Sequence, residues 1–188
     1  YIKVFIDAEN GCISIIDNGK GISVARATNV LLSIGKSTKR QDANRGFRGI
    51  GRLGGLSYCE RLSFTTSVQG EDVATRIIFD CKLLKSLLSP DHEEELDLQS
   101  VIERITEVEE IDADKDDHFF RVDMDEVDSS SELLDLDEIK QYLSEVAQVP
   151  YDERHFVVAP EIKRFLNEHD YTLTEFKIFI GYDEDHLK

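Results

Sequence analysis

The sequence predicts an α/β fold, because strand-like and helix-like patterns alternate along its 188 residues. Alternating apolar residues predict strands over residues 2–6 and 12–16, joined by a two-residue hairpin turn at residues 10–11. Ser23 is a candidate N-cap for a helix that carries apolar residues on one face and ends at Gly35. A hydrophobic content of 40% is typical of a globular chain that buries a core.

The rest of the chain continues this alternation. The further elements predicted from periodicity and turn residues are a short buried helix at 53–59, strands at 61–68 and 73–79, one or two helical turns at 82–88, a strand at 105–111 that pairs with one at 118–127, an amphipathic helix at 136–146, a helix at 161–168 and a last strand at 176–180. Acidic residues dominate residues 91–117, which we interpret as a solvated face or insertion without chemistry.

Composition narrows the classes of partner. A formal net charge of -17 repels the phosphates of nucleic acids and anionic membranes, so we expect no nucleic acid bound through this domain. No apolar run reaches the length of a membrane span, and no signal-peptide pattern opens the chain. Cys12, Cys59 and Cys81 form no CxxC pair, which favours small buried side chains in a reducing, cytoplasmic environment over disulfides or zinc ligands.

The first of two glycine clusters is Asp17-Asn18-Gly19-Lys20-Gly21, at the end of a predicted strand. The Asp17 carboxylate only accepts hydrogen bonds, so it suits an exocyclic amine such as adenine N6. Gly19 and Gly21 would let the backbone approach a flat base. Taken alone, this stretch is more often a hairpin turn than a ligand site.

The second cluster is Gly46-Phe47-Arg48-Gly49-Ile50-Gly51, at the start of a predicted helix. Its backbone N–H groups and the helix dipole favour an anion there. Just before it, Lys36, Ser37 and Thr38 supply one cation and two hydroxyls, although the Walker pattern is absent. The order and spacing of the two clusters predict a pocket that holds an adenine at one end and phosphates at the other.

Together these motifs resemble the GHKL ATPase superfamily of gyrase, HtpG-type heat-shock chaperones, histidine kinases and MutL. Residues 16–22 resemble the adenine-binding DxGxG box, and residues 34–39 resemble the chaperone and MutL stretch that runs into the ATP lid. Residues 46–51 resemble the second glycine box and contain the GFRG of MutL, and residues 137–143 resemble a chaperone helix. The resemblance implies a Bergerat-type two-layer α/β sandwich, with a mixed, mostly antiparallel sheet and helices on one face.

The resemblance also assigns roles to residues. It implies that Asp17 binds the adenine amine, that Lys36 and Ser37 reach phosphate or ribose, and that the amides of residues 46–51 hold the phosphates. For Arg48, in the lid, a surface arginine that balances nearby acids is an equal alternative. The predicted nucleotide-binding residues are Asp17, Gly19, Gly21, Lys36, Ser37, Thr38, Gly46, Phe47, Arg48, Gly49, Ile50 and Gly51.

The resemblance covers roughly residues 1–150, which implies a GHKL-type ATP-binding domain, with residues 151–188 as a C-terminal extension or the start of a following domain. In the family, a helix before the first strand carries a glutamate that activates water and an asparagine that binds Mg²⁺. The chain begins in a strand and without methionine, so we expect it to be part of a longer protein, with that helix upstream of Tyr1. No catalytic residue and no metal ligand is therefore predicted within the chain. Asp117-His118 stands where chaperones and MutL carry Gly-Thr, and His118 is either a substitute hydrogen-bonding group or an ordinary strand-start histidine.

The resemblance implies ATP or ADP with Mg²⁺ as ligands. The main hypothesis is a chaperone-like or MutL-like ATPase in which nucleotide orders a lid over residues 36–55 and drives a conformational switch, with a protein client and an ATP-dependent homodimer as partners. The alternative is a non-catalytic module for nucleotide binding or protein interaction. A histidine kinase core is the third interpretation. It ranks last because the second box of histidine kinases is usually of the GLGL type, which differs from residues 49–54.

Overall fold

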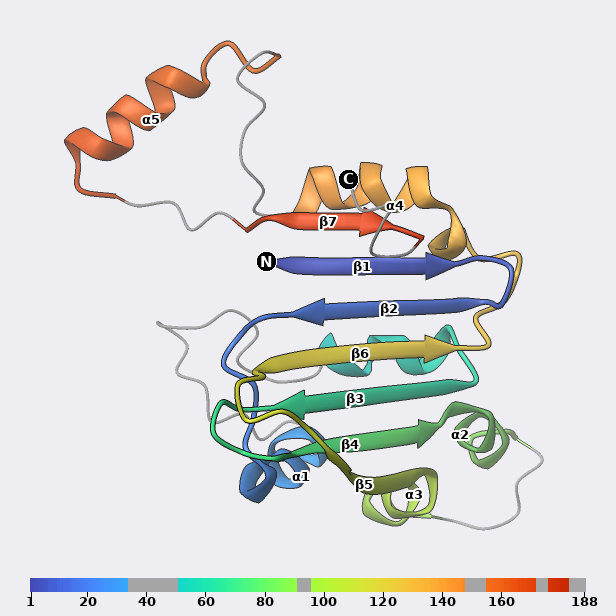
Figure 1. Ribbon diagram of the computed structural model, residues 1–188. Coiled ribbons are helices and arrows are strands. Elements are labelled where there is room, and N and C mark those ends of the chain that lie inside the picture. Colours follow the sequence, from blue (N-terminus) through green and yellow to red (C-terminus); the bar gives the residue numbers. More distant parts are fainter. Residues whose placement is uncertain (34–50, 91–95, 148–154, 172–175, 183–188) are drawn as a thin grey trace.

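A computed structural model describes residues 1–33, 51–90, 96–147, 155–171 and 176–182 of the chain. Its centre is a seven-stranded sheet with strand order β5-β4-β3-β6-β2-β1-β7 (Figure 1). Neighbouring strands are antiparallel, except that β7 lies parallel to β1. The strands are β1 (Ile2–Asp7), β2 (Cys12–Asp17), β3 (Arg61–Ser67), β4 (Val73–Asp80), β5 (Thr106–Asp112), β6 (Phe119–Asp125) and β7 (Ile178–Gly181). The predicted α/β class with a mixed, mostly antiparallel sheet is confirmed.

The helices accompany this sheet. They are α1 (Val24–Leu32), the 3₁₀ helix η1 (Gly51–Ser57), α2 (Cys81–Leu87), α3 (Leu98–Ile105), the 3₁₀ helix η2 (Glu132–Leu134), α4 (Leu136–Val146) and α5 (Ala159–Glu168). In Figure 1 the strands lie in front of η1 (teal) and α4, while α5 lies apart from the sheet. Within the described ranges no helix is both long and apolar enough to cross a membrane.

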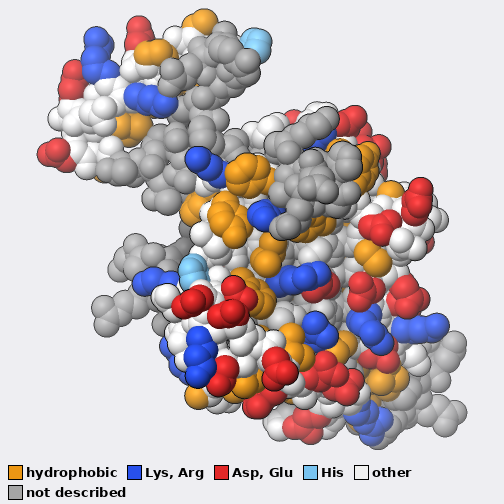
Figure 2. Space-filling model, in the orientation of Figure 1, with side chains coloured by type: hydrophobic (Ala, Val, Ile, Leu, Met, Phe, Trp, Pro, Cys, Tyr) orange, Lys and Arg blue, Asp and Glu red, His pale blue; other side chains and the backbone are white. Residues whose placement is uncertain are grey.

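The face of the sheet turned toward the viewer is polar over its central strands. Figure 2 shows positive and negative side chains interspersed there. Arg121 on β6 pairs with Asp123 on the same strand at 2.8 Å, and Arg76 on β4 pairs with Glu109 on β5 at 3.9 Å. Because alternate residues of a strand point to opposite faces, the apolar residues between these positions face the helices.

The hydrophobic core lies on that second face. Phe64 of β3 is 1% exposed, and its ring packs against Phe79 at a centroid distance of 5.6 Å and against Phe120 at 5.9 Å. Helix α1 contributes Leu31, which is also buried in this cluster. The core therefore joins strands β4, β3 and β6 to one helical layer, as expected for a two-layer sandwich.

The predicted two-residue turn at residues 10–11 is wrong. Asp7 pairs with Cys12, so the connection between β1 and β2 has four residues, 8–11. The Asp7 carboxylate accepts hydrogen bonds from the backbone N–H of Asn10 at 3.0 Å and from its side chain at 2.7 Å, which lowers the pKa of Asp7. Gly11 has a φ of 64°. The Asx turn at Asp7 thus closes the hairpin two residues earlier than the Asn-Gly pair indicates.

The predicted pairing of residues 105–111 with residues 118–127 is also wrong. Strand β5 pairs with β4, with Val108 opposite Ile77, whereas β6 lies between β2 and β3. Helix α3 was not predicted; it begins where the Asp97 carboxylate accepts the N–H of Ser100 at 2.7 Å. The alternation of apolar residues identifies a strand but not its neighbour, and here α3 returns the chain to the β4 edge.

Strand β7 joins the tail of the chain to its beginning. Ile178 is in register with Ile2, and the N–H of Ile2 donates to the carbonyl of Lys177 at 2.8 Å. Residues 178–181 therefore extend the same sheet as residues 2–7. The division into residues 1–150 and 151–188 stays a prediction.

Replacing Phe64 with alanine should lower the free energy of unfolding by about 3–5 kcal/mol, because the cavity lies between the buried ring of Phe79 and the partly buried ring of Phe120. Tyr142→Ala is the control: this ring is 61% exposed on α4, so its loss should change stability by about 0.5 kcal/mol or less. Urea unfolding followed by circular dichroism measures both. Equal effects of the two substitutions would contradict the placement of the core.

Candidate functional site

The Asp17 carboxylate stands at the end of β2, in register with Ile2 on one side and Phe120 on the other. One of its oxygens, Oδ1, accepts the backbone N–H of Gly19 at 2.7 Å. The second oxygen, Oδ2, makes no hydrogen bond with any described residue. This half-buried carboxylate is thus fixed in orientation while one acceptor is left for a ligand.

Gly21 lets the loop after β2 pack directly on the sheet. Its φ is 66°, a conformation that residues with a side chain rarely adopt. A Cβ at this position would overlap the carbonyl oxygen of Ser67 and approach that of Phe119 to 3.1 Å. The absence of a side chain at Gly21 therefore leaves room for the backbone of β3. The predicted contact of Gly21 with a base stays a prediction.

Thr66 binds the same loop through its hydroxyl group. Its side chain lies on β3 and is completely buried. The hydroxyl oxygen accepts the N–H of Ile22 at 2.8 Å, and the hydroxyl donates to the carbonyl of Phe119 at 3.1 Å. One hydroxyl thus joins the loop, β3 and the start of β6. Sequence reasoning did not identify Thr66, because a threonine within an apolar strand carries no local signal of such a partner.

His118 contacts the loop from the residue before β6. Its Nδ1 lies 2.9 Å from the carbonyl oxygen of Gly19. Since a carbonyl oxygen only accepts, Nδ1 carries the proton of this bond, and in the neutral ring Nε2 is then an acceptor. His118 thus makes a hydrogen bond to the loop, while its role as a substitute for the threonine that holds the adenine stays a prediction.

The start of α1 differs in detail from the prediction. Ser23 occupies the N-cap position, but its side chain makes no capping hydrogen bond. Instead, Oε2 of Glu71, in the turn between β3 and β4, accepts the N–H of Val24 at 3.0 Å. Helix α1 ends at Leu32, before the predicted end at Gly35. The loop between β2 and α1 is thus tied to the sheet at both ends.

The structure brings together the adenine half of the predicted site: Asp17, Gly19 and Gly21, with Thr66 and His118 beside them. Gly51 is the first residue of η1, and the neighbouring Gly55 packs against Leu62 of β3. The other predicted nucleotide-binding residues lie outside the described residues; they are Lys36, Ser37, Thr38, Gly46, Phe47, Arg48, Gly49 and Ile50.

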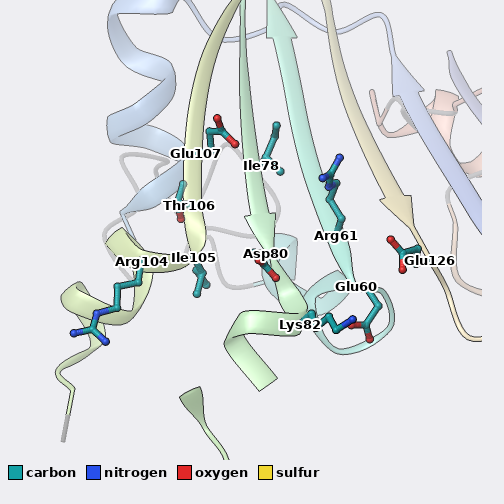
Figure 3. Close-up of a pocket in the computed structure, with 10 residues that line it drawn as sticks. All are labelled: Glu60, Arg61, Ile78, Asp80, Lys82, Arg104, Ile105, Thr106, Glu107 and Glu126. Atoms are coloured by element: carbon teal, nitrogen blue, oxygen red, sulfur yellow. The ribbon is translucent and has the colours of Figure 1, made fainter. Parts of the chain in front are cut away.

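A hollow of about 370 Å³ lies at the end of strands β3, β4 and β5 that is opposite to the level of Asp17 (Figure 3). Its lining includes Arg61, Asp80 and Glu107, whereas Asp17 stands at the level of Thr66 and Thr75. None of its lining residues belongs to the predicted nucleotide site. Across the described ranges, no group of three or more His, Cys, Asp or Glu side chains is placed to hold a metal ion.

The chain matches a known protein family. The family model described as histidine kinase-, DNA gyrase B-, and HSP90-like ATPase matches residues 1–115, which is more than half of the chain. The matched range contains both glycine clusters, Thr66 and strands β1 to β5. No curated protein matches the chain.

Replacing Thr66 with valine should lower the free energy of unfolding by about 1–3 kcal/mol, because the buried N–H of Ile22 loses its acceptor. Thr75→Val is a matched control. Thr75 is also buried, faces Thr66 across the β3–β4 pair, and its hydroxyl has no hydrogen-bond partner among the described residues. Its replacement should therefore be neutral or stabilising. Urea denaturation compares the two variants. A loss of stability in Thr75→Val as large as that in Thr66→Val would contradict the role given to the hydrogen bonds of Thr66.

Proposed function

Because the chain belongs to the family of histidine kinase-, DNA gyrase B- and HSP90-like ATPases, we propose that it binds the adenine of ATP or ADP at the loop after β2. One observation carries this proposal. The Asp17 carboxylate is held by the N–H of Gly19 at 2.7 Å, and its second oxygen has no partner among the described residues. Such an oxygen accepts the exocyclic N6–H of adenine without a rearrangement of the loop.

The surroundings of Asp17 supply the rigidity that this recognition needs. Thr66 holds Ile22, and His118 holds the carbonyl of Gly19, so both sides of the glycine loop are fixed to the sheet. A site that is formed before the ligand arrives does not lose affinity to the ordering of its own loop. With Nδ1 bound to the carbonyl of Gly19, a neutral ring of His118 would offer Nε2 as a further acceptor beside the loop.

The phosphate half of the proposal rests on sequence. Lys36, Ser37 and Thr38, together with the amides of residues 46–51, supply the cation, hydroxyls and N–H groups that bind phosphate oxygens. Mg²⁺, which ATPases of this family use, would neutralise charge on the phosphates. The described residues offer no cluster that fits a metal ion, so we assign no ligand and no step to it.

At the finer level, we propose a chaperone-like or MutL-like switch. The sequence boxes at residues 34–39 and 46–51 support it, and they imply that nucleotide orders residues 36–55, with a homodimer as one outcome. A net charge of -17 favours a protein client over nucleic acid, and we propose a cytoplasmic location. The alternative is nucleotide binding without hydrolysis, suggested by Asp117-His118 in place of Gly-Thr. Steady-state ATPase assays of the full-length protein distinguish the two.

Asp17→Asn should weaken ADP binding by about 1–3 kcal/mol, as measured by calorimetry of the full-length protein with Mg²⁺. Asparagine keeps an oxygen for the N–H of Gly19 but turns its amide N–H₂ toward the adenine amine, so two donors face each other. Asp7→Asn is the control, since Asp7 lies at the opposite end of the β1–β2 pair and should leave binding unchanged. No measurable ADP binding by the unmodified protein would end the nucleotide hypothesis.

Gly49→Val tests the phosphate half of the site separately. A side chain there should block the phosphates and spare the base, so ADP binding should fall while adenosine binding is retained. Competition of ADP and adenosine with a fluorescent adenine nucleotide measures both affinities. Equal loss of the two ligands would mean that the second glycine cluster has a structural role only.

A further inference from the structure

Two buried thiols lie side by side where η1 leads into β3. The Sγ atoms of Cys59 and Cys81 are 4.0 Å apart, and their side chains are 1% and 0% exposed. Cys59 precedes β3 by two residues, and Cys81 is the first residue of α2. The N–H of Cys81 donates to the carbonyl of Glu60 at 2.9 Å, so the two backbones are tied together beside the sulfur atoms.

The two thiols are chemically unequal. The Cys59 Sγ lies 3.2 Å from the carbonyl oxygen of Gly55 and 4.0 Å from the Cys81 Sγ, so its single proton can be donated to either acceptor. The Cys81 Sγ lies 3.6 Å from the carbonyl oxygen of Phe79.

The hydrogen bond between the sulfur atoms lowers the pKa of Cys81 and, with burial, raises the pKa of Cys59 well above its ordinary range. Cys81 therefore loses its proton first, while Cys59 supports the resulting thiolate. The Nζ of Lys85 lies 3.2 Å from the carbonyl oxygen of Cys59, although its ion pair with Glu60 at 2.8 Å offsets part of its charge.

We propose that Cys59 and Cys81 form an oxidation site at which a peroxide converts the two thiols into one intramolecular disulfide. The Cys81 thiolate attacks a peroxide oxygen, so the O–O bond breaks and a sulfenic acid forms. The sulfur of Cys59 then attacks the Cys81 sulfur, the S–O bond breaks, and the departing hydroxide takes the Cys59 proton as water. In total, two thiols and one hydrogen peroxide give one disulfide and two water molecules, with sulfur oxidised and oxygen reduced.

The geometry permits this step with a local movement. A disulfide requires a sulfur separation of about 2.05 Å, so the side chains must close by roughly 2 Å. The movement releases the Cys59 thiol from Gly55, so the end of η1 is the part that oxidation alters. A hollow of about 590 Å³ is lined by Tyr58, Glu60 and Lys85, which neighbour the thiols, but by neither cysteine. Because both cysteines are buried, an oxidant reaches them only through a local opening, and a small peroxide passes such an opening more readily than a bulky thiol reagent.

The inference does not depend on nucleotide binding, and mass spectrometry of the full-length protein tests it. After hydrogen peroxide treatment, the protein is denatured, its remaining thiols are alkylated, and it is digested without reduction. We expect a peptide pair that links Cys59 to Cys81 and is separated by dithiothreitol. Cys12→Ser is the matched control, because this third, half-buried cysteine should not affect the link. Alkylated Cys59 and Cys81 after treatment, irreversible oxidation without a link, or a link through Cys12 would each overturn the proposal.

Single variants test the order of the two steps. In Cys59→Ser the serine hydroxyl can still donate to Cys81, so peroxide should give a Cys81 sulfenic acid, which dimedone labels when the protein is denatured in its presence. In Cys81→Ser the remaining Cys59 should be labelled far less. Labelling of Cys59 that equals or exceeds that of Cys81 would contradict the assigned roles. The linked peptide pair of the unmodified chain keeps the proposal testable even if a variant folds poorly.

Discussion

The hydrogen bonds of the buried Thr66 hydroxyl are the constraint on which the candidate site depends. They fix Ile22 and the start of β6 to the same strand, which leaves the preceding loop only one way to cross the edge of the sheet. Gly21 is required by that crossing, since a Cβ would overlap the backbone of β3. The same loop path places the N–H of Gly19 on the Asp17 carboxylate and so orients it. The proposed recognition of the base would therefore depend on the sheet that holds this loop.

A strongly acidic chain that binds a polyanion needs a local source of attraction. Charges on the exposed surface act over about 8–10 Å at ordinary ionic strength. A net charge of -17 spread over 188 residues therefore does not determine the affinity for a phosphate at one site. The decisive groups are the nearest ones. The cations of the boxes at residues 34–39 and 46–51 are Lys36, Lys39 and Arg48, and backbone N–H groups add attraction without net charge. The same argument applies to Asp17 in the proposed binding mode: this carboxylate would contact the base, while the phosphates would lie at the other end of the ligand.

The sequence could predict the elements but not their partners. Alternating apolar residues located strands such as β3 and β4, and the amphipathic pattern located α4, because both signals are local. The β1–β2 connection and the neighbour of β5 were predicted wrongly, since the Asx turn at Asp7 and the return through α3 outweigh local preference. In the site, Asp17 and Gly21 were found through a local glycine motif, although nothing yet tests their roles toward a nucleotide. Thr66 was missed because its partner lies 44 residues away.

Strand β3 links the two chemical features of the molecule, and its rigidity decides how they communicate. Thr66, near its C-terminal end, holds the adenine loop, while Cys59 precedes its N-terminal end beside Cys81. The strand is hydrogen-bonded on both sides, to β4 and β6, so a change at one end does not shift the other. If the proposed disulfide affects nucleotide binding, the effect would therefore pass through η1, which would lose the Cys59–Gly55 contact and begins at Gly51 of the second glycine cluster. This path would alter the proposed phosphate half of the site rather than the proposed contact of Asp17 with the base.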